Sequence, residues 1–79
     1  MKKTKWLVCL LKAKGKRKIT VKVLSPNYVP KEGVALQVVG TFWYKDNAQL
    51  MARYPDTKKA WGTMLQVTDE GLWDYLPHR

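Results

Sequence analysis

The chain has 79 residues and a formal net charge of +9, because 15 lysines and arginines face only six acidic residues. A chain of this length can bury a single hydrophobic core, and the apolar content of 46% with four tryptophans is enough to fill one. These values predict one small basic domain over residues 1–79, and they exclude both a disordered tail and an enzyme with separate cofactor and substrate domains.

The N-terminus is basic from Met1 to Lys5 and then apolar from Trp6 to Leu11. Six apolar residues are fewer than the roughly 7–15 of a signal-peptide core, and far fewer than the roughly 20 of a membrane span. We therefore expect a cytoplasmic protein with no membrane segment. Cys9 is the single cysteine, which excludes an internal disulfide, and its apolar surroundings predict a small buried side chain.

Residues 5–13 and 17–24 are expected to form a β-hairpin, since apolar and polar residues alternate after residue 18 and Gly15 suits the turn. A two-residue loop places six apolar residues on the core face: Trp6, Val8, Leu10, Ile19, Val21 and Val23. A three-residue loop would turn the first strand over. Because Trp6–Leu11 is apolar on both faces, either a C-terminal helix or a second copy of the chain must cover the other face, which leaves a homodimer open.

Residues 25–30 contain two prolines and predict an irregular connection. Residues 34–44 are ambiguous, because Pro30 and Glu32 would suit the start of a helix, whereas the β-branched and aromatic residues favour a strand. We favour a third strand, with Gly40 at a β-bulge.

The C-terminal part predicts short helices. Asp46 is a suitable N-cap for a helix over 47–54 that ends at Pro55, and Asp56 is a suitable cap for a second helix over 57–65. A last helical turn is expected to begin at residues 68–70. The predicted class is α+β, with an N-terminal antiparallel hairpin or three-stranded sheet packed against short C-terminal helices.

The positive charge is concentrated at the N-terminus. Residues 1–22 carry nine of the 15 cations and no acidic residue, whereas the six cations of residues 23–79 are balanced by all six acids. A one-sided basic surface attracts polyanions. The candidate phosphate-contacting residues are therefore the hairpin cations: Lys12, Lys14, Lys16, Arg17, Lys18 and Lys22. The alternative interpretation is that these lysines only solvate an exposed hairpin or protect an edge strand.

Nucleic acid is the favoured partner, and an acidic protein surface is the alternative. DNA is favoured over RNA because a two-stranded ribbon fits the DNA major groove. Only Arg17 has the planar group that suits reading of guanine. The lysines would contact phosphates, which predicts modest sequence preference and steep salt dependence.

Trp43 and Tyr44 are neighbours and cannot both face inward from a strand. One of them is expected outside, where it would stack on a base or contact a partner. The alternative is an amphipathic ring that covers the rim of the core.

Gly40-Thr41-Phe42, with Ala48, Ala52 and Tyr54 downstream, resembles the strand-to-helix junction of plant AP2-type and phage-integrase arm-binding DNA domains. The resemblance covers about fifteen residues. It implies three strands followed by a helix, and it implies nothing about individual binding residues.

The sequence offers no natural catalytic set and predicts no cofactor, no metal site and no enzyme. The single serine, Ser25, lies in the proline-containing connection, and the single histidine, His78, is penultimate. The acidic group Asp69, Glu70 and Asp74 could suggest general acid–base chemistry. At the start of the last helix, however, Asp69 and Glu70 are more simply explained by the helix dipole. The competing hypothesis is a phage or mobile-element protein that binds a host protein, in which Trp61, Trp73 and Tyr75 would be contact residues.

Overall fold

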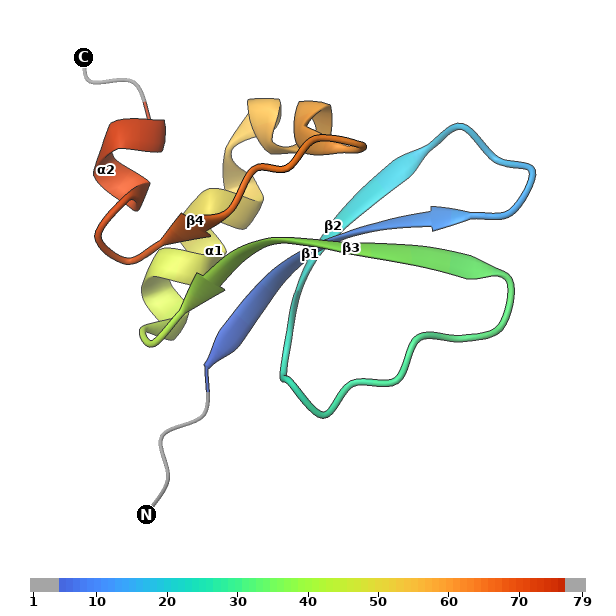
Figure 1. Ribbon diagram of the computed structural model, residues 1–79, viewed down its shortest axis with the longest axis horizontal. Helices are drawn as coiled ribbons and strands as arrows, with labels where there is room; N and C mark the ends of the chain where they lie inside the picture. The colour runs from blue at the N-terminus through green and yellow to red at the C-terminus, as the bar shows by residue number, and fades with distance from the viewer. Residues whose placement is uncertain (1–4, 77–79) are drawn as a thin grey trace.

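The computed structural model describes residues 5–76 and shows four strands and three short helices (Figure 1). Their order along the chain is β1 (Trp6–Ala13), β2 (Ile19–Leu24), β3 (Val34–Phe42), α1 (Lys45–Arg53), the 3₁₀ helix η1 (Pro55–Ala60), β4 (Val67–Thr68) and α2 (Leu72–Tyr75). The predicted α+β class is confirmed. Lys2, Lys3, His78 and Arg79 lie outside the described residues.

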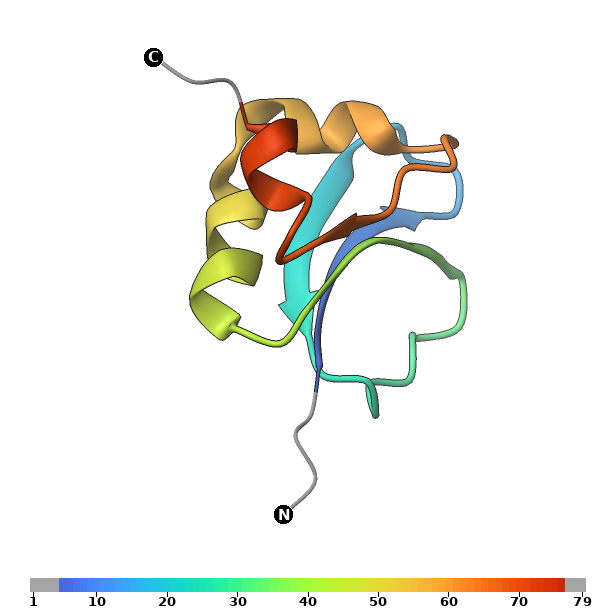
Figure 2. The ribbon, with the colours of Figure 1, turned by 60° about the vertical axis from the view of Figure 1, so that its left-hand side comes forward.

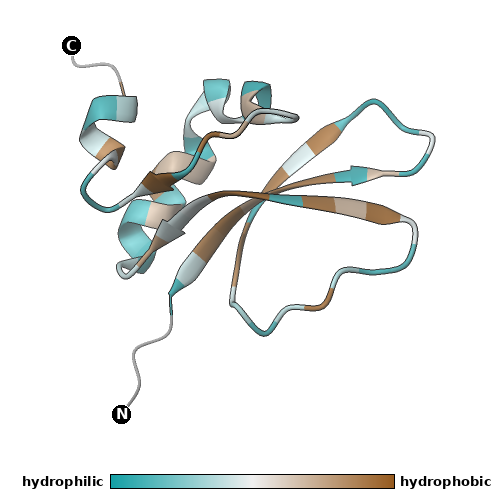
Figure 3. Cartoon of the chain, viewed as in Figure 1, coloured by the Kyte–Doolittle hydropathy of each residue, from teal (hydrophilic) through white to brown (hydrophobic). Residues whose placement is uncertain are grey.

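The sheet has the order β2-β1-β3-β4, so that the first strand lies inside it. β1 is antiparallel to both β2 and β3, whereas β3 and β4 are parallel. The strands β1 and β3 carry the longest apolar stretches, and the hairpin turn between β1 and β2 is hydrophilic (Figure 3). No helix within residues 5–76 has the length and apolar character needed to cross a membrane.

The two strands of the hairpin share the face predicted for a two-residue loop, although the connection is longer: β1 ends at Ala13 and β2 begins at Ile19, not at residue 17. Leu10 pairs with Val21 and Val8 pairs with Val23, so these four side chains share one face. Val8 and Leu10 are fully buried, and the β2 valines pack against the same cluster. Helix α1 covers this face through the buried side chains of Ala48 and Met51.

The second face of β1 carries Cys9 and Leu11, which are only 1% and 8% exposed. They lie between β2 and β3, opposite Lys22 and Thr20 on one side and Val38 and Leu36 on the other. The connection 25–33 and the two α-helices lie on opposite sides of β1 in both views (Figure 2). Neither a C-terminal helix nor a second copy of the chain is therefore needed to bury this face.

Burial raises the pKa of the Cys9 thiol to about 11. At pH 8 the folded protein should hold about a hundredfold less thiolate than an ordinary cysteine, and the thiolate is the form that reacts. We expect Cys9 to react with a maleimide far more slowly in the folded protein than in denaturant. Equal labelling rates under the two conditions would contradict the buried position.

Residues 34–42 form a strand, as favoured, and not a helix. The register with β1 shifts at the predicted bulge: Val8 pairs with Gly40 and Cys9 pairs with Val38, which leaves Val39 as the extra residue. A Cβ atom at Gly40 would lie 2.7 Å from the Phe42 ring and 2.8 Å from the Met51 sulfur. The glycine thus allows β3 and α1 to approach closely.

The predicted helix boundaries were partly wrong. Helix α1 begins at Lys45, so that Asp46 lies in its first turn and makes no side-chain capping bond. The second helix ends at Ala60 because the chain turns at Gly62, where φ is +82°. Residues 67–68 form a strand that the sequence did not predict, and α2 starts at Leu72.

Candidate nucleic-acid interface

The six candidate cations gather at one end of the sheet, around the β1–β2 turn. All are exposed except Lys12, which is half-buried near the end of β1. Backbone hydrogen bonds hold this end together: Lys16 N–H donates to the Ala13 carbonyl at 3.0 Å, and Lys14 N–H donates to the Gly33 carbonyl at 2.8 Å. The second bond ties the hairpin turn to the start of β3. The hairpin is therefore not a free two-stranded ribbon, since β3 accompanies β1 as far as Ala13.

Three of the cations line a groove on the sheet face that carries Cys9 and Leu11. The groove has a volume of about 310 Å³, with Lys16, Lys18 and Lys22 among its walls. Its remaining lining residues are small, apolar or hydroxylated: Leu11, Ala13, Thr20 and Val34. No aromatic or acidic side chain lines this groove, so it suits phosphate better than a nucleobase.

Two other cations, Lys12 and Lys14, line a pocket of about 420 Å³ on the opposite side of the same sheet end. Trp61 also lines this pocket, although it lies 49 residues after Lys12 in the sequence. Arg17 lines neither cavity. The hairpin cations are thus divided between two faces, and each face has a cavity beside it.

Trp61 is brought to this pocket by a network around Gln37 of β3. The Gln37 side-chain amide donates to the carbonyls of Ala60, at 3.1 Å, and Thr63, at 2.9 Å. Its oxygen accepts a 2.7 Å hydrogen bond from the Gly62 N–H. One side chain of the sheet thereby holds the whole turn after η1, and with it the Trp61 backbone.

No acidic side chain within residues 5–76 forms an ion pair with the hairpin cations. Within residues 5–76 one ion pair is present, between Lys59 and Asp56 at 3.3 Å, and it belongs to η1. Lysines that fan into solvent from one face of the hairpin would favour nucleic acid, whereas lysines paired with the C-terminal acids or with a second chain would favour a protein partner. Within the described part of the chain five of the six cations are exposed and Lys12 is half-buried, but they lie on two faces and not on one, so this expectation is met only in part.

Trp43 and Tyr44 are both exposed, at 48% and 63%, although only one was expected outside. They follow β3 at the end of the sheet that lies away from the hairpin turn. The Lys5 ammonium lies 4.6 Å from the centre of the Trp43 ring and occupies one of its faces. At about 3.3 Å per residue, the seven steps of β1 separate this aromatic pair from the turn by roughly 23 Å. The structure therefore does not bring the predicted stacking residues together with the hairpin cations.

The sequence predicted that Asp69 stabilises the start of the last helix, α2. In the structure its carboxylate instead accepts hydrogen bonds at the start of α1. Oδ2 accepts a hydrogen bond from Trp43 N–H and Oδ1 accepts one from the Asn47 amide, both at 2.7 Å. Burial tends to raise the pKa of Asp69, but the hydrogen bonds from Asn47 and from the backbone of Trp43 and Tyr44 outweigh it and hold the pKa below its usual value.

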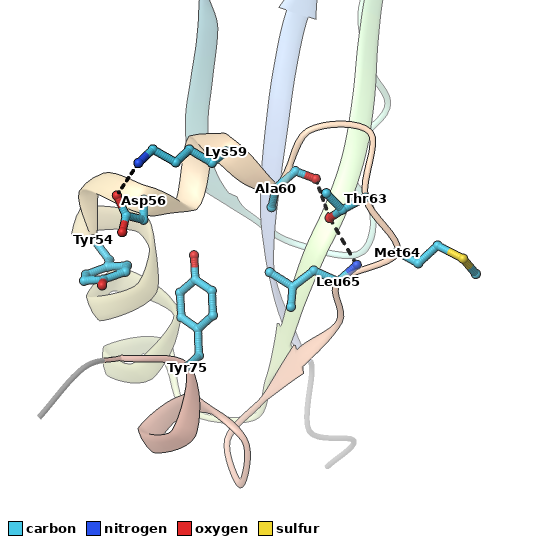
Figure 4. Close-up of a pocket in the computed structure, with 8 residues that line it drawn as sticks. All are labelled: Tyr54, Asp56, Lys59, Ala60, Thr63, Met64, Leu65 and Tyr75. Carbon is cyan, nitrogen blue, oxygen red and sulfur yellow. Dashed lines mark hydrogen bonds and ion pairs between the residues drawn. The ribbon is translucent and has the colours of Figure 1, made fainter.

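The largest cavity described, of about 580 Å³, lies between η1, the turn after it and α2 (Figure 4). Tyr54, Leu65 and Tyr75 line it, and Met64 at its margin is 96% exposed. Its single cation, Lys59, is the one paired with Asp56. This cavity is therefore poorly suited to a polyanion.

The described residues contain no cluster of three or more histidine, cysteine or acidic side chains that could hold a metal ion. Comparison with known proteins adds no relative: no family model, no curated protein and no solved structure matches the chain.

Trp61 is the residue that the sequence analysis missed as a neighbour of the hairpin cations. The sequence around it predicted that the second helix would continue to residue 65. The available signal was the small pair that flanks it, Ala60 and Gly62, which indicates a turn at least as well as a helix.

Proposed function

We propose that this protein is a small cytoplasmic nucleic-acid-binding factor that contacts phosphates through the cations around its β1–β2 turn. The observation that carries this proposal is that these cations, five of them exposed, form no ion pair with an acidic side chain in the described part of the chain. Uncompensated positive charge at one end of a small domain produces a local positive potential, and nucleic acid is the commonest cellular polyanion that matches it.

The kind of cation also supports a particular mode of binding. Five of the six candidates are lysines, whose ammonium groups contact phosphates without reading base edges. The groove that contains Lys16, Lys18 and Lys22 has no amide, carboxylate or guanidinium that would distinguish bases. We therefore expect weak sequence preference and an affinity that falls steeply with salt.

The variant Lys16→Ala/Arg17→Ala/Lys18→Ala tests the proposal. All three side chains are exposed and lie between β1 and β2, so the fold should remain intact while the affinity falls by about tenfold or more at physiological salt. The measurement is a fluorescence titration with labelled single-stranded and duplex DNA and RNA at several salt concentrations. The log–log salt slope of the variant should be shallower by roughly two to three.

The matched control is Lys45→Ala/Arg53→Ala/Lys58→Ala, which removes the same charges from exposed positions of α1 and η1. Its affinity should remain close to that of the unmodified protein. If the two triple variants lose affinity equally, net charge and not the hairpin end determines binding.

A second function, the binding of another protein, is favoured by the cavity in Figure 4. Its aromatic and aliphatic lining and the protruding Met64 are typical of a protein contact. If the unmodified protein binds none of the four nucleic acids, this alternative replaces the first proposal. Identification of the bound protein in a pull-down would then show whether the partner belongs to a host, as the hypothesis of a phage or mobile-element factor expects.

A further inference from the structure

We infer that the nucleic acid is bound as a single strand, with one unpaired base stacked on Trp61 and adjacent phosphates held by Lys12 and Lys14. This inference rests on the proposed function and specifies its ligand. It concerns the pocket on the helix-bearing side of the sheet, which no sequence pattern assigned.

The pocket has the components of a single-strand site. Two cations and an indole ring line it, and no acidic side chain does so. Its volume of about 420 Å³ lies within the range of about 300–1,000 Å³ typical of small-ligand sites. Gly15 and Gly33 lie at its edge with open space where a Cβ would stand, so a sugar-phosphate chain can approach the backbone there.

The position of Trp61 is well defined. Gln37 fixes the turn on both sides of the tryptophan through its three hydrogen bonds to Ala60, Gly62 and Thr63. The indole ring itself is half-buried and packs against the hydrophobic core, so it loses little conformational entropy when a base stacks on its exposed part. Trp43 and Tyr44 are less suitable, because they lie at the other end of the sheet, away from the hairpin cations, and Lys5 covers one face of Trp43.

The division of the cations between two faces also favours a single strand. A flexible strand can leave the Trp61 pocket, pass around the β1–β2 turn and continue along the groove of Lys16, Lys18 and Lys22. A duplex is stiff over about 150 base pairs and does not bend around a turn of this size without cost. Proteins that bind single strands combine this kind of basic path with aromatic stacking.

The test compares Trp61→Leu, Trp61→Phe and the control Trp43→Leu for binding to single-stranded DNA, single-stranded RNA and duplex DNA. If a base stacks on Trp61, Trp61→Leu should weaken binding to one of the single strands by about tenfold or more. Trp61→Phe should retain part of the affinity that Trp61→Leu loses, and Trp43→Leu should leave the affinity nearly unchanged. A second measurement uses Trp6→Phe/Trp43→Phe/Trp73→Phe, in which Trp61 is the only indole and its emission should be quenched by a single strand.

The outcomes separate the inference from the proposed function. The single-strand site would be overturned if the protein bound duplex DNA more tightly than single strands and Trp61→Leu kept the full affinity. If the hairpin triple variant nevertheless lost affinity, the proposed nucleic-acid binding would stand. Absence of all binding would overturn both. If Trp61→Leu proves unfolded by circular dichroism, the quenching of the lone Trp61 decides: unchanged emission on saturation with a single strand would overturn the inference.

Discussion

The substitution Gly40→Ala is expected to lower the free energy of unfolding by about 1–3 kcal/mol, because the core has no room for a methyl group at this position. Its Cβ would lie 2.7 Å from the Phe42 ring and 2.8 Å from the Met51 sulfur, and both side chains are fully buried. Either α1 must move away from β3 or both side chains must leave their rotamers. For a domain of this size the loss corresponds to a decrease in Tm of about 4–8 °C per kcal/mol.

Gly71→Ala is the matched control, since the nearest atom to its Cβ would be 3.8 Å away and its φ of −86° is accessible to alanine. Its Tm should change little. A thermal or urea melt followed by circular dichroism measures both variants. Equal stability of the two would show that the β3–α1 contact is looser than described.

The substitution Asp69→Ala is expected to lower the free energy of unfolding by about 2 kcal/mol. The carboxylate links the turn after β4 to the start of α1 through its bonds to Trp43 N–H and the Asn47 amide. Without it, the Trp43 N–H loses its acceptor and α1 loses the negative charge at its N-terminus. Asp69→Asn should also be destabilised, because a neutral amide replaces the charged acceptor of both hydrogen bonds.

The pH dependence follows from the lowered pKa of Asp69. A carboxylate whose folded-state pKa is depressed stabilises the protein above the pKa of an unfolded aspartate, about 3.9, and this stabilisation is lost as the pH falls through the folded value. The stability difference between the unmodified protein and Asp69→Asn should therefore be full at pH 6 and shrink below about pH 4. Glu70→Gln, at an exposed neighbouring acid, is the control and should show no such difference. A pH-independent difference would mean that the charge of Asp69 is not involved.

The sequence predicted the local part of this structure well. The alternation of Ile19, Val21 and Val23 identified β2 and the face that it shares with Val8 and Leu10, although the connection between the strands is longer than the two residues assumed. The β-branched content of residues 34–42 identified β3, and Gly40 indicated the bulge. These features depend on the pairing of side chains close along the chain or on a period of two, which a sequence records directly.

Several boundaries were wrong because the deciding partner is remote in sequence. Asp46 has the chemistry of an N-cap, but Asp69 supplies the hydrogen bonds at the start of α1 from 22 residues beyond Asn47. The strand β4 has two residues and exists because β3 offers Gly40 and Thr41 for parallel pairing. The strand propensity of a two-residue segment is too weak a signal to predict such a strand.

The candidate interface likewise combines features that consecutive residues determine with features that only remote contacts determine. The sequence by itself determined that the positive charge is concentrated in residues 1–22 and that the hairpin carries it, because charge and strand period are properties of consecutive residues. Only the tertiary structure decided that this charge lies on two faces, that Trp43 and Tyr44 stand at the far end of the sheet, and that Trp61 stands beside Lys12 and Lys14. The physical reason for the position of Trp61 is the Gln37 network, in which one side chain of β3 holds a turn more than 20 residues away in the sequence. A contact between such distant residues leaves no periodic signal in the sequence.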